Sequence, residues 1–226
     1  MQRLRTYINS LILAGLTCLP VTTQADIITA IGSANQFDDI YSFEFTIEED
    51  ISDTTLFHAT LTNTSPDDND PAGSNPVIDL LAFNLAGDPV LGTDFIIDSV
   101  SPDWMFVAGG SGGVLFDYVG DANSPSDRIA IGESLTFDID FVNDVDLDIF
   151  TLAETDAGTG IGGGEDIGQV AVSFQSLGLD NDFSDLVAAN FFNVPPPNII
   201  VPEPRILALF SLGLMLMAGF LRRRRA

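Results

Sequence analysis

Apolar and polar residues alternate with a period of two along much of the chain. The pattern is clearest at residues 41–47, 57–62, 135–141 and 170–175. Alternation of this kind places one face of a strand against a core and the other in water, as in an antiparallel sheet with one packed face. Apolar and β-branched runs predict further strands at residues 27–31, 77–85, 95–100, 104–108 and 114–119.

Turn-forming residues separate these strands. Segments rich in Gly, Pro, Asn and Asp lie at residues 65–76, 109–113, 120–127 and 156–168. One short helix is predicted near residues 184–190. Many short strands divided by such turns indicate an all-β fold, an antiparallel β-sandwich in one domain, with a jelly roll among the double-sheet arrangements that fit.

The N-terminus has the three parts of a signal peptide. Arg3 and Arg5 are followed by a mainly apolar run at residues 8–19 and by small residues that end at Ala25. The apolar run is shorter than the roughly 20 residues that span a bilayer. We therefore expect residues 1–25 to be a signal peptide that is cleaved after Ala25.

The C-terminus reads as a membrane segment with a charged end. Its uncharged stretch, residues 206–221, would form a helix of about 24 Å, which spans a bilayer only if flanking arginines snorkel. The positive-inside rule keeps the arginine cluster in the cytoplasm and places residues 26–201 on the outer face of the inner membrane. The flanking residues are Pro202, Glu203 and Pro204 on one side and Arg222, Arg223, Arg224 and Arg225 on the other.

This order of parts resembles the PEP-CTERM sorting signal of Gram-negative bacteria, and the resemblance covers about the last 25 residues. It implies that a membrane protease of the exosortase type recognises Pro202, Glu203 and Pro204, removes the helix and releases the body. A plain tail anchor is the alternative, because a proline pair also stops a helix from extending. The expected parts are a signal peptide at 1–25, a β-sandwich domain at 26–193, a Pro-rich linker at 194–200 and the sorting signal with its transmembrane helix at 201–226.

Charge is distributed very unevenly. Residues 26–201 hold 32 acidic residues, the 33 of the chain less Glu203, against one basic residue, Arg128, which gives a formal charge of −31. Such a body repels nucleic-acid phosphates and anionic lipid surfaces. It attracts divalent cations that prefer oxygen ligands, although the same carboxylates also serve simply to keep an exported surface hydrated. Removal of Cys18 with the signal peptide would leave no cysteine for disulfides or metal sites.

No catalytic motif of the chain has the context that it needs. The G-x-S-x-G spacing at residues 109–113 lacks a following helix and a later histidine, and the G-x-G-x-x-G spacing at 158–163 lies in no strand-turn-helix unit. The one histidine, His58, is expected on the polar face of its strand as surface decoration, and alone it cannot build a zinc site. The sequence therefore predicts a protein that is not an enzyme.

Acidic clusters could still hold calcium, which takes six to eight oxygen ligands. One cluster lies in the loop at residues 67–70. Neither cluster has the spacing of an EF-hand. The larger one, the candidate calcium site, consists of Asp138, Asp140, Asp144, Asp146 and Asp148.

These features together predict an exported, non-catalytic protein of the cell surface or extracellular matrix, associated with exopolysaccharide or biofilm. Its expected partners are an exosortase-type protease, the membrane before processing, and exopolysaccharide. The alternative is a calcium-dependent module that binds carbohydrate or protein, with a carbohydrate-active hydrolase as a third class. Sugar rings stack on aromatic side chains, and the candidates for such contacts are Tyr41, Trp104, Phe106 and Tyr118.

Overall fold

A computed structural model describes residues 25–36, 39–67, 75–109, 115–159, 165–178 and 182–193. The chain divides into two compact units, Met1–Val194 and Pro195–Ala226, and every described residue belongs to the first. The predicted signal peptide up to residue 24, the linker and the sorting signal lie outside the described residues. Among the helices that are described, none is long and apolar enough to cross a membrane.

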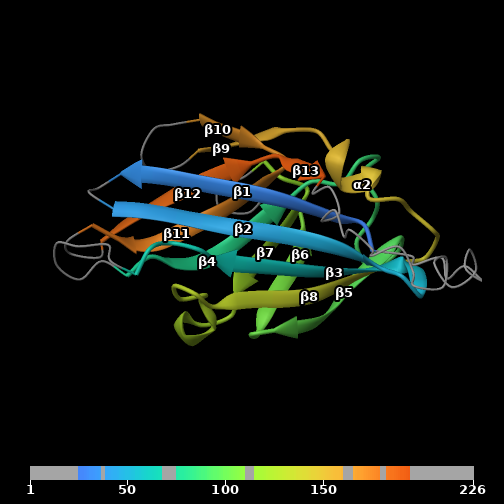
Figure 1. The fold of residues 1–226 in the computed structure, drawn as a ribbon, viewed down its shortest axis with the longest axis horizontal. Helices are drawn as coiled ribbons and strands as arrows, with labels where there is room; N and C mark the ends of the chain where they lie inside the picture. The colour runs from blue at the N-terminus through green and yellow to red at the C-terminus, as the bar shows by residue number, and fades with distance from the viewer. Residues whose placement is uncertain are drawn as a thin grey trace, which may run out of the picture. The chain divides into compact units, whose positions relative to one another are not determined.

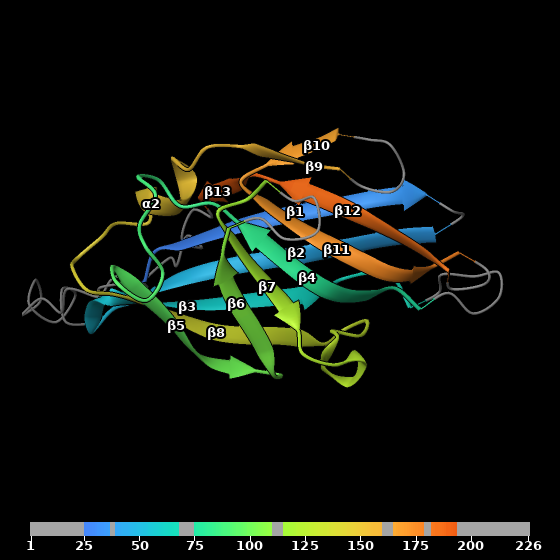
Figure 2. The same ribbon diagram turned by 180° about the vertical axis from the view of Figure 1, so that it is seen from behind.

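The described unit is all-β and consists mainly of two antiparallel sheets (Figures 1 and 2). Sheet A has six strands in the order β13 (Phe191–Asn193), β1 (Ile27–Gln36), β2 (Asp39–Asp50), β3 (Asp53–Asn63), β8 (Ser134–Phe141) and β5 (Phe95–Ser101). Sheet B has five, in the order β12 (Phe183–Ala189), β11 (Val170–Leu177), β4 (Val77–Phe83), β7 (Tyr118–Ala122) and β6 (Trp104–Ala108). The predicted fold class, an antiparallel β-sandwich, is confirmed at this level.

Three short elements complete the described unit. The strands β9 (Asp156–Thr159) and β10 (Glu165–Gly168) pair with each other as a separate hairpin. A single turn of 3-10 helix, η1 (Pro125–Asp127), follows β7, and one short helix, α2 (Asp148–Thr151), follows β8.

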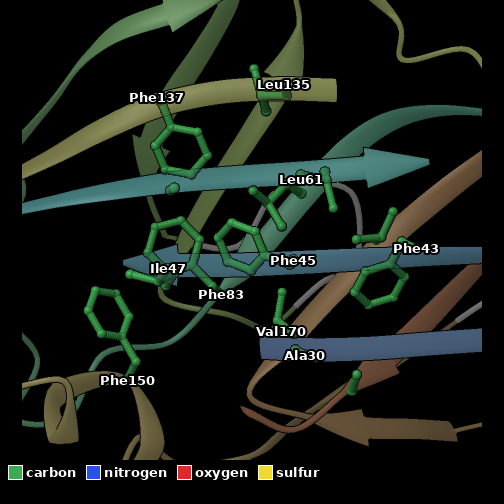
Figure 3. Packing of buried hydrophobic residues seen from close by; sticks show 14 of the residues in the cluster. Ala30, Phe43, Phe45, Ile47, Leu61, Phe83, Leu135, Phe137, Phe150 and Val170 are labelled. Carbon is green, nitrogen blue, oxygen red and sulfur yellow. The ribbon is translucent and has the colours of Figure 1, made fainter. Parts of the chain in front are cut away.

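The core lies between the two sheets, where phenylalanine rings from both meet (Figure 3). The ring of Phe45 on β2 packs against Phe137 on β8, with centroids 6.1 Å apart, and against Phe83 on β4 at 6.4 Å. All three side chains are fully buried or nearly so. Burial of such a side chain stabilises the fold by roughly 1.5–3 kcal/mol, so this aromatic layer is a main reason why the sheets stay together.

Buried amide side chains fasten the irregular segments to this core. The side-chain amide of Gln169 donates to the carbonyls of Thr151 at 2.7 Å and Ala153 at 3.1 Å. Its Oε1 accepts the backbone N–H of Phe191 at 2.9 Å. One side chain thus satisfies buried backbone groups at the end of α2 and at the start of β13, which would otherwise be costly to bury.

The predicted helix near residues 184–190 is wrong, because this segment forms β12 and pairs with β11. Both faces of β12 are covered. Val187 and Ala189 belong to the core between the sheets, while Leu186 and Ala188 pack in a second apolar cluster. A strand buried on both faces shows no period-two alternation, which removed the signal that would have identified it.

Two segments that were predicted as turns are partly strands. β7 continues through Gly120, where an added Cβ would lie 2.5 Å from the ring of Phe106, and the predicted loop at residues 156–168 contains β9 and β10. Gly168 packs so closely on β12 that a Cβ would lie 2.4 Å from the carbonyl of Ala189. The glycines at these positions permit close packing of neighbouring strands rather than a turn.

Candidate functional site

The polar face of sheet A carries a row of titratable side chains. The strand register aligns Glu48 of β2 with His58 of β3, His58 with Asp138 of β8, and Asp138 with Asp98 of β5. Each of these residues alternates with inward-facing apolar residues, so all four project from the same face. A single imidazole therefore lies among carboxylates contributed by three neighbouring strands.

Both nitrogens of the His58 ring have a carboxylate partner. Nδ1 lies 2.7 Å from Asp138 Oδ1 and Nε2 lies 3.1 Å from Asp50 Oδ2, and the side chain of His58 is 47% exposed. Only the protonated ring can donate from both nitrogens. The hydrogen bonds to Asp138 and then to Asp50 accordingly raise the pKa of His58.

Asp50 is itself held by its neighbours. Its carboxylate accepts the backbone N–H of Ser52 at 2.7 Å and the hydroxyl of Ser52 at 2.6 Å. Those two bonds, followed by the bond from His58, lower the pKa of Asp50 to about 2. We call the set Asp50, His58 and Asp138 the histidine clasp, because it joins the end of β2 to β8 across β3. His58 is thus a surface residue as predicted, but it has a defined structural role that sequence reasoning missed.

The histidine clasp differs from a nucleophile-activating arrangement. In such an arrangement one ring nitrogen accepts a proton from a Ser, Thr or Cys side chain. Here both nitrogens of His58 face carboxylates. The geometry supports electrostatic fastening of strands and does not provide a base that is free to activate a hydroxyl group.

The five predicted calcium ligands are not gathered into one site. Asp138 is engaged by His58, Asp140 accepts a hydrogen bond from Thr55 at 3.4 Å, and Asp144 accepts one from Thr54 at 2.9 Å. Asp146 lies in the connection after β8, and Asp148 is the first residue of α2. Across the described residues, no three His, Cys, Asp or Glu side chains lie close enough together to hold a metal ion. In the other acidic cluster, residues 68–70 lie outside the described residues.

Three of the four aromatic residues that were predicted as contacts for sugar belong to the buried core, and the fourth, Phe106, is partly buried against it. Tyr41 is fully buried, Trp104 is 4% exposed and Tyr118 is 3% exposed. The ring of Phe106 packs on Phe137 with centroids 4.7 Å apart. Tyr41, Trp104 and Tyr118 therefore offer little ring surface to a sugar.

The predicted cleavage site lies at the start of the described unit, beside acidic residues. Ala25 lines a shallow depression together with Glu48, Glu49, Asp50 and His58. The backbone N–H of Glu49 donates to the carbonyl of Asp26 at 3.2 Å, which fixes the first residue after the predicted cut against β2. The sorting residues Pro202, Glu203, Pro204, Arg222, Arg223, Arg224 and Arg225 lie outside the described residues.

Sheet B carries a second titratable pair that the sequence did not indicate. Arg128, the one basic residue of the body, lies 4.0 Å from Oδ2 of Asp79 on β4. Burial raises the pKa of Asp79, and its buried Oδ1 has no hydrogen-bond partner among the described residues. At this distance the pair is a weak ion pair rather than a binding site.

Comparisons with protein-family models, with curated proteins and with solved structures gave no match for this chain. The strongest functional signals lie at the two ends of the sequence, and the described unit shows what those ends would carry.

Proposed function

We propose that the chain is an exported, non-catalytic protein of the cell surface or extracellular matrix, processed by an exosortase-type protease. The observation that carries this proposal is the order of parts at the C-terminus: Pro202, Glu203 and Pro204, an uncharged stretch at residues 206–221, and a terminal arginine cluster. The signal-peptide pattern at residues 1–25 provides the matching route out of the cytoplasm.

The distribution of charge supports the proposal. Seven of the eight basic residues lie in the two ends, and only Arg128 lies in the body. Positive charge at membrane-flanking positions holds those positions in the cytoplasm, whereas a body of charge −31 does not bind anionic membrane surfaces. After removal of both ends the product would be a hydrated polyanion, which suits release from a membrane into a matrix.

The strand register at the edge of sheet A also supports the proposal. β1 and β13 are antiparallel neighbours, and Ile28 is aligned with Asn193. The first and last residues of the described unit therefore lie at the same end of this sheet. A body built in this way can be joined to one membrane through both of its ends without unfolding.

The test is substitution of the sorting motif in cells that carry the exosortase-type protease. Pro202 and Pro204 cannot donate backbone hydrogen bonds and favour extended structure before them, which leaves Glu203 as the charged side chain offered to a protease. We expect Glu203→Ala, or deletion of Arg222 to Arg225, to leave export intact and to block release. The uncut body should accumulate in the inner membrane with its full tail.

The matched control is Glu154→Ala, which removes an exposed carboxylate from the body. It should be released as the unaltered protein is. Fractionation and mass spectrometry of the membrane and the medium give the readout. Release of the Glu203→Ala protein at the mature mass would refute the sorting role and favour the plain tail anchor.

A further inference from the structure

Sheets A and B each end in two edge strands, whose unpaired backbone groups can pair with another chain. Three of the four edges are protected. β13 has only three residues, the β9–β10 hairpin lies against β12, and the start of β5 is bonded to the turn before it, where Gly92 donates to the carbonyl of Phe95 at 2.7 Å. In the part of the chain that the structure describes, nothing pairs with the outer side of β6.

β6 is an unusual edge for such an acidic body, because all five of its residues are uncharged. Hydrogen bonds from Asn123 to the carbonyl of Asp103 and from Gly109 to the carbonyl of Asp117 fix which residues face β7. By the alternation of an antiparallel pair, Phe106 and Ala108 direct their backbone N–H and C=O groups away from β7. These groups are available to an added strand.

An apolar groove of about 440 Å³ runs beside this edge, between β6 and β5, which are neighbours in Figure 2. None of the residues that line it is charged. Ile96 and Met105 are 46% and 56% exposed. The principal apolar lining residues are Ile96, Ile97, Val100, Trp104, Met105 and Phe106.

The chain contains a segment that matches this groove. Residues 194–201 carry no charge and end in Ile199, Ile200 and Val201. The prolines at positions 195–197 predict an extended backbone before these aliphatic residues. In a body of charge −31, an uncharged groove and an uncharged segment are two of the few surfaces that do not repel each other.

Residues 194–201 are too short to reach from the end of β13 to the groove of the same copy and also to fill it. It begins after Asn193 of β13, and β13 and β5 are opposite edges of sheet A. Five steps between strands, at about 4.8 Å each, make a width of about 24 Å. Eight residues extend to about 29 Å at most, so the crossing alone would leave only about one residue to enter the groove.

We propose that residues 194–201 of one copy dock in the β5–β6 groove of a second copy, where they pair with Phe106 and Ala108 as an added strand. The groove borders β5, whereas the chain leaves the described unit at β13, the opposite edge of sheet A. The contact is therefore head-to-tail and leads to open chains of copies. This inference goes beyond export and concerns how the exported body associates with itself.

The test uses residues 26–201, which contain all of the described core residues, from Ile28 to Phe191, and the described part of the first compact unit. Sedimentation at about 0.15 M salt, where the Debye length is roughly 8 Å, should show a mass that grows with protein concentration. Association should weaken by roughly tenfold or more in two variants, Ile199→Asp with Ile200→Asp and Met105→Asp alone, because each places a charge in an apolar contact. Ile31→Asp is the control, since Ile31 is also 56% exposed but lies on β1.

A peptide of residues 194–201 provides the second readout. Trp104 is the only tryptophan of the chain and lines the groove, so the peptide should shift its fluorescence and dissolve the assemblies. Each of three results would overturn the proposal. The protein could stay monomeric, its assemblies could persist in Ile199→Asp with Ile200→Asp, or Met105→Asp and Ile31→Asp could have equal effects on association. These measurements use purified protein, so their failure is distinct from a failure of export.

Discussion

The imidazole of His58 shows how one side chain can depend on residues far away in the sequence. Its partners are Asp50, eight residues earlier, and Asp138, eighty residues later. The alternation of residues 57–62 predicts that His58 faces outward, and it does. Its partner on β8 could not be predicted, because no pattern within one strand shows which strand will be its neighbour or in which register.

The same limit applies to the aromatic residues. Tyr41 falls in step with Phe43 and Phe45, so the alternation itself indicated that it faces the core, and the structure buries all three. Trp104 lies on a five-residue strand, which is too short for a clear period. Its burial depends on sheet B facing sheet A, which the residues of β6 alone do not reveal.

The histidine clasp predicts a pH dependence of stability. The pKa of His58 is raised above its unfolded value, which is about 6.5. A raised pKa means that the stabilisation is complete below pH about 6.5 and is lost as pH rises through the pKa of the folded state. We expect His58→Gln to lower the free energy of unfolding by about 0.2–1 kcal/mol at pH 5.5, the usual range for exposed ion pairs, and to have no effect at pH 9.

Urea unfolding of both proteins at the two pH values measures this difference. Asp138→Asn is the companion variant, because it keeps the shape of the carboxylate and removes its charge. It should remove the larger part of the same pH-dependent increment, because the bond from His58 to Asp50 remains. The difference in free energy of unfolding between His58→Gln and the unaltered protein could instead be equal at both pH values. That result would show that packing, not charge, explains the effect.

At the scale of elements, the two sheets are joined by a buried polar contact as well as by aromatic packing. The hydroxyl of Tyr41 on β2 donates to the carboxylate of Asp185 on β12, and Asp185 is 5% exposed. This contact also helps to explain why residues 183–189 form a strand. As β12, the segment directs Asp185 at Tyr41 and Val187 into the core, contacts that local helix propensity cannot anticipate.

We predict that Tyr41→Phe lowers the free energy of unfolding by about 1–3 kcal/mol, because it leaves a buried carboxylate without its donor. The ring contact between residue 41 and Phe174, with centroids 5.1 Å apart, should persist. Tyr118→Phe is the matched control. It removes a bond to the carbonyl of Pro89, a half-buried residue whose oxygen can turn to water, so the loss should be smaller. Equal urea midpoints for the two variants would refute the role assigned to Asp185.

At the scale of the whole molecule, the sequence predicted the sandwich because most strands show alternation or apolar runs between clear turns. It missed β9, β10 and β12, whose residues are either glycine-rich or apolar on both faces. It also missed β13, which has only three residues. The five residues of the candidate calcium site are spread out for a related reason. Asp138 and Asp140 share one strand face, but Asp148 begins a separate helix, so closeness in sequence did not become closeness in space.

The excess of acidic residues in the body predicts how its stability responds to salt. Residues 26–201 carry a formal charge of −31, and their mutual repulsion opposes the compact state. Sodium chloride raised from about 0.02 M to about 0.5 M shortens the Debye length several-fold and should therefore raise the urea midpoint. Because no three acidic groups of the described residues gather around a common point, calcium and magnesium chlorides at equal ionic strength should have equal effects. Saturable stabilisation by calcium alone, rising as expected for binding to the native state, would contradict this prediction and restore the calcium site.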